Sequence, residues 1–185
     1  QGVSSAASDV YKRQDLRHRL EHCSFTTDDQ LTRIAAAGLS VSFLMNHVYY
    51  WGAAFRDTIL GPARAGRLDR VASAYQAGLS PSLHSDYNVT AVHPLLSART
   101  AVLRQTKADG QVLNAAECAT PAQALAAITT NAAWQIHADD RGTLEVGKVA
   151  DFGLADGNPW GSDPAGWADV AFQATYVDGT IAWQA

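Results

Sequence analysis

The stretch Ser82–Val89 (SLHSDYNV) places an imidazole, His84, and a carboxylate, Asp86, at the end of a short apolar run. This run follows a helix-like segment that stops at Gly78, so we expect a strand that gives way to a loop at His84. Taken alone, Asp86 is at least as readily a turn residue as a functional one, because Asp commonly caps and turns chains. In barrel enzymes, however, polar groups at the carboxyl ends of strands carry the chemistry. The remainder of the chain decides between these two interpretations.

Strands and helices alternate on both sides of this stretch. Thr27 and Gln30 fit a capping box at the start of one helix, and Thr120-Pro121 opens another. The predicted strands are 16–23, 39–44 and 79–83, and the predicted helices are 27–37, 62–77, 94–106 and 120–135. Such alternation predicts βαβ units and a parallel sheet, and therefore an α/β fold.

Two other segments differ from this pattern. Residues 45–61 are rich in aromatic side chains and are expected to form a long connection, and connections of that length often carry function. Residues 142–156 and 175–183 are short alternating runs punctuated by Gly, with Asp178-Gly179 as a hairpin signal. The sequence therefore predicts antiparallel strands at the end of the chain.

Composition narrows the class of protein. The chain has 185 residues, 47% hydrophobic and 17% charged, which suits one domain with a small addition. A net charge of −4 gives no basic footprint for nucleic acid, and no apolar run reaches the ~20 residues of a membrane helix. We expect a small-molecule substrate, no nucleic-acid or membrane partner, and a homo-oligomer as an open option; the compartment stays open.

Cys23 and Cys118 are far apart and are expected to be free, buried thiols, with a single disulfide as the alternative. Residues 1–14 (QGVSSAASDVYKRQ) are Ser- and Ala-rich without a sustained period. They resemble a translated adaptor and are left out of the fold prediction. Because the chain has no initiator Met, we expect that it begins inside a longer protein.

Three clusters of chemically active side chains lie at predicted strand ends. They are His18/Glu21/His22 on the first strand, Asn46-His47 after the second, and His84-Ser85-Asp86 after the third. The ends of parallel strands converge on one face, so these clusters can meet at one site. His and Asp are common ligands of divalent transition metals. A lone His is more often structural, and His93 and His137 are interpreted in that way.

Four motifs, in order, resemble the metal-dependent amidohydrolases, specifically the branch called amidohydrolase family 3. Arg17–Cys23 (RHRLEHC) is similar to the family's "RHRIEH" strand, and Ser85-Asp86 to the "SD" of its last barrel strand. Thr129–Ala133 (TTNAA) resembles a "T-x-N-A-A" helix, and Gly142–Asp151 (GTLEVGKVAD) a "G-x-L-x-x-G-K-x-A-D" signature. The resemblance covers residues 15–185.

The resemblance implies roles for individual residues. His22 and Asp86 would be metal ligands, Asp86 would also be the catalytic general base, and His84 would be catalytic as a stabiliser of the oxyanion. His47, Asn46 and Tyr50 would contact substrate. The implied cofactor is a divalent transition metal, most simply zinc, as one or two ions in the complete parent. His18 is interpreted as a core or supporting residue.

The implied fold is the C-terminal part of a (β/α)8 TIM-type barrel, about strands six to eight, followed by strands of a small flanking β-sandwich. Residues 15–137 would belong to the barrel and 138–185 to the sandwich. The family's H-x-H pair, its strand-four ligand and its strand-five His have no counterpart here, and two ligands do not make a catalytic zinc site. The parent would then have roughly 500 residues or more, and the 185-residue chain alone would be inactive.

The implied function is metal-dependent hydrolysis of carbon–nitrogen bonds other than peptide bonds, such as those of amides, N-formyl groups or cyclic ureas. Deamination and isomerisation remain open within the same fold. A different class also remains open: a non-catalytic or truncated relic that keeps the scaffold and binds a ligand. An H-x-H motif in the preceding sequence would favour the enzyme.

Overall fold

A computed structural model describes residues 15–185. The adaptor-like segment 1–14 lies outside the described residues. Seven α-helices are described: α2 (Asp28–Ala36), α3 (Asn46–Ala54), α4 (Pro62–Ala65), α5 (Val71–Gln76), α6 (Pro94–Leu103), α7 (Pro121–Ala127) and α8 (Thr130–Gln135). A π-helical turn (Phe55–Ile59) extends α3, and two 3₁₀ turns cover Ala115–Glu117 and Pro164–Asp169.

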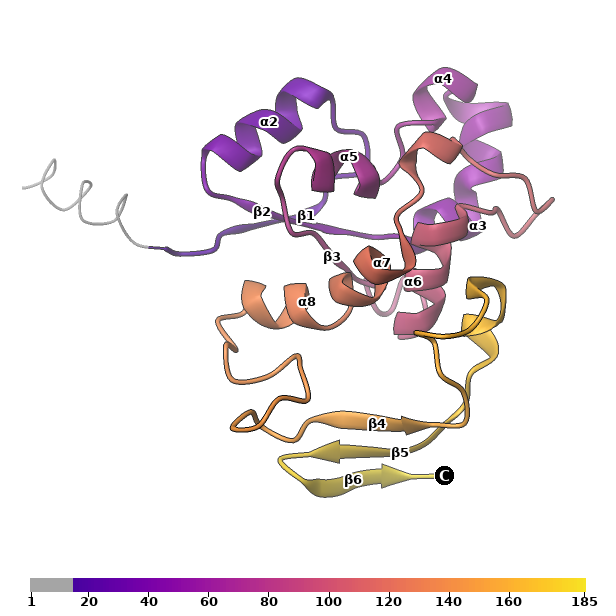
Figure 1. The fold of residues 1–185 in the computed structure, drawn as a ribbon. Coiled ribbons are helices and arrows are strands. Elements are labelled where there is room, and N and C mark those ends of the chain that lie inside the picture. The colour runs from indigo at the N-terminus through magenta and orange to yellow at the C-terminus, as the bar shows by residue number, and fades with distance from the viewer. Residues whose placement is uncertain (1–14) are drawn as a thin grey trace, which may run out of the picture.

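The strands form two separate sheets. One is parallel, in the order β1 (Arg19–His22), β2 (Ser40–Phe43), β3 (Ser82–Leu83), and the other is antiparallel, in the order β4 (Phe152–Ala155), β5 (Phe172–Val177), β6 (Thr180–Gln184). Helices α2 and α5 lie on one side of the parallel sheet and α7 and α8 on the other, with the antiparallel sheet beyond them (Figure 1). The predicted α/β alternation and the terminal antiparallel strands are therefore confirmed.

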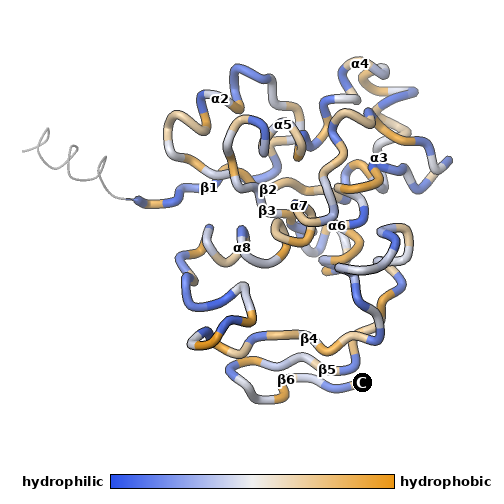
Figure 2. The backbone as a smooth tube through the Cα atoms, in the orientation of Figure 1, coloured by the Kyte–Doolittle hydropathy of each residue, from blue (hydrophilic) through white to orange (hydrophobic). Residues whose placement is uncertain are grey.

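The core follows from the alternation of side chains along β2. Val41 and Phe43 are fully buried and pack with Leu31 and Ile34 of α2, the apolar face predicted from their i, i+3 spacing. Hydrophobic residues accordingly gather on β2 and α7 near the centre of the molecule (Figure 2). Trp167, in the 3₁₀ turn near the C-terminus, is also fully buried in this core. The end of the chain is thus anchored to the part that carries the parallel sheet.

Local signals placed several element ends correctly. Thr27 and Thr120 both form complete capping boxes, in which the side-chain oxygens of Gln30 and Gln123 accept a hydrogen bond from the backbone N–H of the cap residue. Asp178 and Gly179 have φ values of 49° and 70° between β5 and β6. Two consecutive positive φ angles are what a two-residue hairpin turn requires, so the hairpin prediction is confirmed.

The prediction of one helix over 62–77 is wrong, because a turn separates α4 from α5. Arg104 is fully buried, and its guanidinium donates hydrogen bonds to the backbone carbonyls of Leu68 (2.7 Å) and Asp69 (2.9 Å). Asp69 also has a φ of 47°, outside the right-handed helical region. The carbonyls of Leu68 and Asp69, which would continue helix α4 into α5, are therefore bound by Arg104 at the C-terminal end of α6.

The predicted loop over 45–61 is instead helix α3 with its π-helical extension. Val48 is fully buried, and Gly52 lies so close to Thr106 that an added Cβ would come within 2.9 Å of its Cγ2. A buried segment must satisfy its own backbone groups, and a helix does so. The prediction of a long connecting loop is therefore wrong.

The helix predicted over 120–135 breaks into α7 and α8 at Thr129. The Thr129 hydroxyl donates to the carbonyl of Leu125, a bond that favours bending, and the backbone at Thr129 leaves the helical region. Gln135 of α8 then donates to the Val41 carbonyl (2.8 Å). Strand structure predicted from 142 begins only at Phe152, because residues 142–150 form exposed turns without strand pairing.

Candidate functional site

The three parallel strands end side by side. Their register pairs His22 with Phe43 and Phe43 with Leu83, and the backbone N–H of His84 continues the ladder to the Phe43 carbonyl at 2.9 Å. His22 has a φ of 64° and Asp86 one of 48°, so the chain turns sharply at both positions. At these turns the chain leaves the sheet, and the predicted functional side chains lie at the same positions.

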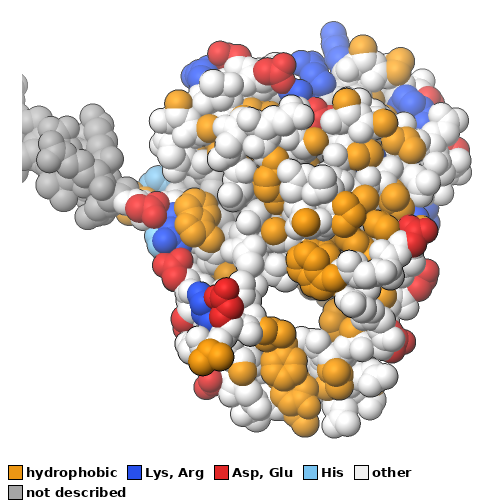
Figure 3. Space-filling view, in the orientation of Figure 1, with side chains coloured by type: hydrophobic (Ala, Val, Ile, Leu, Met, Phe, Trp, Pro, Cys, Tyr) orange, Lys and Arg blue, Asp and Glu red, His pale blue; other side chains and the backbone are white. Residues whose placement is uncertain are grey.

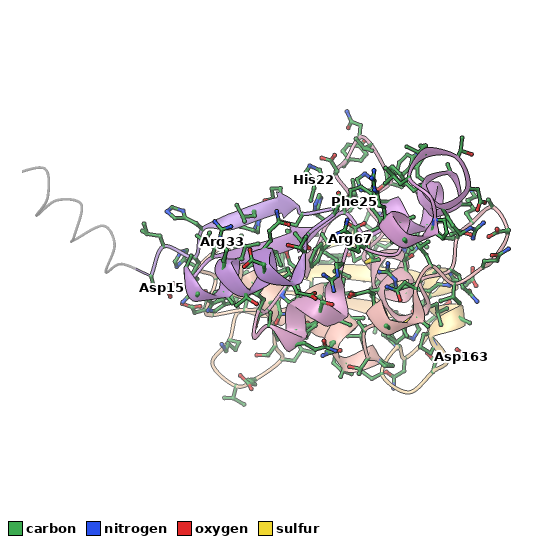
Figure 4. The ribbon with its side chains drawn as sticks, turned by 90° about the horizontal axis from the view of Figure 1, so that it is seen from above. Asp15, His22, Phe25, Arg33, Arg67 and Asp163 are labelled. Atoms are coloured by element: carbon green, nitrogen blue, oxygen red, sulfur yellow. The ribbon has the colours of Figure 1, made fainter. Side chains whose placement is uncertain are left out.

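Three imidazole rings meet at this edge. The ring centroids of His22 and His84 are 4.9 Å apart in an edge-to-face arrangement, and those of His22 and His47 are 6.3 Å apart and nearly parallel. Figure 4 shows His22 at the far end of β1 from Asp15, with Phe25 just beyond it. The structure therefore brings together side chains from three segments that are more than 60 residues apart at their extremes.

A cavity of about 1280 Å³ adjoins this cluster. His22, His84 and Asp86 line it on the sheet side, and Phe152 and Trp160 line it on the side of the antiparallel sheet. The space-filling view shows an opening between these two parts of the molecule (Figure 3). The cavity is large enough for a small-molecule ligand together with water.

Burial favours the neutral form of two of these imidazoles, those of His47 and His84. Burial lowers the pKa of His84, although the nearby Glu21 carboxylate opposes this change. Burial also lowers the pKa of His47, and the neighbouring His22 and His84 lower it further, while Asp86 acts in the opposite direction. Within residues 15–185, Nε2 of His84 is buried without a hydrogen-bond partner, and its nearest carboxylate oxygen, Glu21 Oε2, is 3.9 Å away.

These donors fit part of a metal site. A metal ligand must be a neutral imidazole or an ionised carboxylate, and a buried imidazole nitrogen without a partner is suited to binding a cation or a ligand. Yet no three His, Cys, Asp or Glu side chains of the described chain form a metal-binding group. The chemistry of the donors therefore suits a divalent metal, but the described residues supply fewer than the three ligands of a catalytic zinc site.

Asn46 has a different position from the one expected of a substrate contact. It is fully buried at the start of α3, and its amide donates to the Thr90 hydroxyl at 2.9 Å. Thr90 in turn donates to the carbonyl of Ser85, directly before Asp86. Asn46 thus holds the loop that carries Asp86, rather than facing the cavity.

Tyr50 also lies away from the imidazole cluster. Its ring packs edge-to-face on Tyr49, with centroids 4.9 Å apart, and the Lys107 ammonium lies 5.1 Å from its centroid. His47, three residues earlier on the same helix, is the residue of this segment that reaches His22. The side chain of Trp51 packs against His47 from the outer side, at 5.5 Å between centroids.

The remaining histidines and the cysteines lie outside the imidazole cluster, and His93 and His137 make structural contacts. His93 caps α6 by accepting from the Leu96 N–H, and its Nε2 lies 3.1 Å from the Ala168 carbonyl. His137 Nε2 lies 3.3 Å from the Leu16 carbonyl. His18 is exposed, so its interpretation as a core residue is wrong; it directly precedes β1, which lies at the edge of the parallel sheet. Cys23 and Cys118 are free, as expected, but only half-buried.

Two acidic side chains belong to the site: Glu21, which the sequence placed in the first strand-end cluster without a role, and Asp69, which sequence reasoning missed. Glu21 lines the cavity beside His84, and Asp69 lies behind His47, with 3.9 Å between Asp69 Oδ2 and His47 Nδ1. Glu21 could be found from the sequence because a charged residue is unusual on a strand of a parallel sheet. Asp69 gave no such signal, since it sits in a run with helical spacing.

Comparison with known proteins places the chain in a family. A model described as the amidohydrolase family matches residues 4–182. The chain belongs to the amidohydrolase family. It is 30% identical over 170 residues to the N-substituted formamide deformylase of Arthrobacter pascens, covering 90% of this chain and 31% of that protein. It is 35% identical over 133 residues to the imidazolonepropionase of Pseudomonas savastanoi pv. phaseolicola, covering 71% and 28%.

Solved amidohydrolase-type structures share the fold. An uncharacterized metal-dependent hydrolase from Pyrococcus horikoshii OT3 superposes with a TM-score of 0.67 at 23% identity, covering 87% of this chain and 33% of that one. The chain thus spans about a third of the length of the relatives it matches. No helix within residues 15–185 has the length and apolarity to cross a membrane.

Proposed function

We propose that the protein containing this chain is a metal-dependent hydrolase of carbon–nitrogen bonds other than peptide bonds. Amides, N-formyl groups and cyclic ureas are its proposed substrates. The observation that carries the proposal is the convergence of His22, His84 and Asp86 at one edge of the parallel sheet, at the ends of β1 and β3 and beside one cavity. In this proposal β1–β3 are about strands six to eight of a (β/α)8 barrel, and β4–β6 belong to a flanking β-sandwich.

His22 and Asp86 are the proposed ligands of a divalent metal, with zinc favoured by the imidazole and carboxylate donors. The further ligands would come from segments outside these residues. When bound, zinc supplies Lewis-acid polarisation and makes a water nucleophile available at neutral pH. The family membership and the similarity to a metal-dependent hydrolase support this assignment at the level of the superfamily.

The chain's own residues would handle the protons. Asp86 takes the proton of the attacking water and returns it to the leaving nitrogen, so that one carboxylate serves as base and then as acid. His84 lines the same cavity and has a buried nitrogen that no residue of the described chain occupies, so it is suited to bind the substrate's carbonyl oxygen. His84 and Asp86 are both half-buried, which limits the water around them. Less water strengthens the proton transfer by Asp86 and the hydrogen bond of His84 to the substrate.

The test is metal content and turnover of the full-length protein that carries this chain. We expect bound transition metal by elemental mass spectrometry, and Asp86→Asn is expected to reduce kcat at least ~100-fold. Asp29→Asn, an exposed carboxylate on α2, is the matched control and should retain full activity. Absence of transition metal together with unchanged turnover of Asp86→Asn would falsify the proposal.

The alternative is a non-catalytic, ligand-binding relic of the same scaffold. The observation in its favour is that residues 15–185 hold no three-ligand group. The preceding sequence discriminates between the two: an H-x-H motif and a further His at the fifth strand favour the enzyme, and their absence favours the relic.

A further inference from the structure

Asp69 is a buried carboxyl group that the proposed reaction does not use. It lies in the turn between α4 and α5, with a φ of 47° and a fully buried side chain. Its backbone N–H donates to the Ser24 carbonyl at 2.9 Å, which fixes the turn against the segment after β1. Within the described residues, neither carboxyl oxygen has a hydrogen-bond partner. A buried polar group without a partner is costly and calls for a functional explanation.

Arg104 explains how the carboxyl group is held but does not bind it. The guanidinium donates to the backbone carbonyls of Leu68, Asp69 and Leu113 at 2.7, 2.9 and 2.7 Å. All three bonds go to main-chain oxygens, so the side chain of Asp69 stays free of Arg104. Burial raises the pKa of Asp69, whereas the Arg104 cation, which stays charged, acts against that rise.

His47 is the group that the Asp69 carboxyl faces. Asp69 Oδ2 is 3.9 Å from Nδ1 of His47, and the Ser24 hydroxyl is 3.4 Å from the same nitrogen. The His47 ring lies nearly parallel to His22, with 6.3 Å between centroids, and edge-to-face with Trp51, with 5.5 Å between centroids. Nδ1 therefore points into the protein, and Nε2 is the nitrogen left for a ligand.

We propose that Asp69 is a positioning residue for His47: its carboxyl group, 3.9 Å from Nδ1, favours a proton on that nitrogen electrostatically and so leaves the Nε2 lone pair available to the substrate. The tautomer of a histidine is set by the hydrogen bond that its other nitrogen makes. His47 then meets a hydrogen-bond donor of the substrate, such as an amide N–H, rather than the carbonyl oxygen. This inference rests on the proposed function only for the identity of that substrate.

Nitrogen-15 NMR of the full-length protein, labelled at histidine, tests the tautomer directly. The His47 signals are assigned by their loss in His47→Gln. We expect Nδ1 to carry the proton in the wild type and Nε2 to be of the unprotonated type. Asp69→Ala should shift the population to the Nε2–H tautomer, whereas Asp69→Asn, which keeps an acceptor oxygen and tolerates positive φ, should retain much of the original one.

Glu117→Gln is the control, because Glu117 is an equally buried carboxylate that binds Arg70 and Ser73 instead. It should leave the His47 signals unchanged. An Nε2–H tautomer in the wild type, or no change in Asp69→Ala, overturns the proposal; if Asp69→Ala does not fold, the wild-type tautomer alone decides.

Turnover gives a second readout. Asp69→Ala should lower kcat by about 10–100-fold, as removal of a supporting partner typically does. Asp69→Asn should keep most of the kcat that Asp69→Ala loses. A simple loss of folded protein would not produce this difference between the two variants. If the wild type and both variants hydrolyse none of the proposed substrates but the tautomers behave as expected, the proposed function fails and the positioning role stands.

Discussion

Thr90 links Asn46 to the loop that carries Asp86, and its hydroxyl makes two hydrogen bonds there. Thr90→Val keeps the shape of the side chain and removes only the hydroxyl. It leaves the buried Asn46 amide and the Ser85 carbonyl unpaired. At about 1 kcal/mol for each neutral hydrogen bond, and more where a buried partner stays unsatisfied, unfolding should become easier by about 2–3 kcal/mol.

Thr90→Ser is the matched control. It keeps both hydrogen bonds and loses one buried methyl group, which corresponds to about 0.8 kcal/mol. Urea denaturation measures both variants: with a slope of about 2 kcal/mol per molar, the valine variant should move the midpoint by about 1 M and the serine variant by less than half of that.

The functional consequence should follow the same order. Release of the 85–90 loop should speed amide hydrogen exchange at residues 86–89 and reduce turnover of the full-length protein about 10–100-fold for valine, with a small effect for serine. A valine variant within about 0.5 kcal/mol of the wild type, or a serine variant as unstable as the valine variant, would refute the role given to this hydroxyl.

Three further predictions concern stability and association. Thr27→Ala should destabilise the chain by about 1 kcal/mol in urea denaturation through loss of the capping box, whereas Thr27→Ser should be close to the wild type. The hydrogen bond from Thr106 and that from Arg56 hold the pKa of Asp109 at about 2, below the usual 3.8, so its contribution to stability is present above pH 3.8 and disappears as the pH falls toward 2. The midpoint difference between wild type and Asp109→Asn should therefore vanish over that range, and a constant difference would contradict it. Leu20 is 40% exposed on the edge strand β1, so the 185-residue chain should self-associate, and Leu20→Lys should reduce its mass in light scattering at equal concentration.

The amidohydrolase motifs and the local signals were readable from the sequence because they depend on neighbouring residues. The capping boxes at Thr27 and Thr120 each involve positions three residues apart. The hairpin at Asp178-Gly179 depends on two residues that tolerate positive φ. The convergence of His22 and His84 also followed from the parallel strand order, since all strands of a parallel sheet end at the same edge.

Tertiary structure decided what depends on contacts between distant residues. Arg104 binds carbonyls 35 and 36 positions away and thereby splits the predicted helix 62–77. Burial of the segment after β2 turned a predicted loop into α3 and drew Asn46 inward, to Thr90. Periodicity reports which face of one element is apolar, not which side chain of another element will meet it. The sequence by itself therefore determined the family, the α/β order and most of the strand-end cluster. Only the packed chain placed the Asp69 carboxyl behind His47, because that contact joins two elements whose separate patterns carry no trace of it.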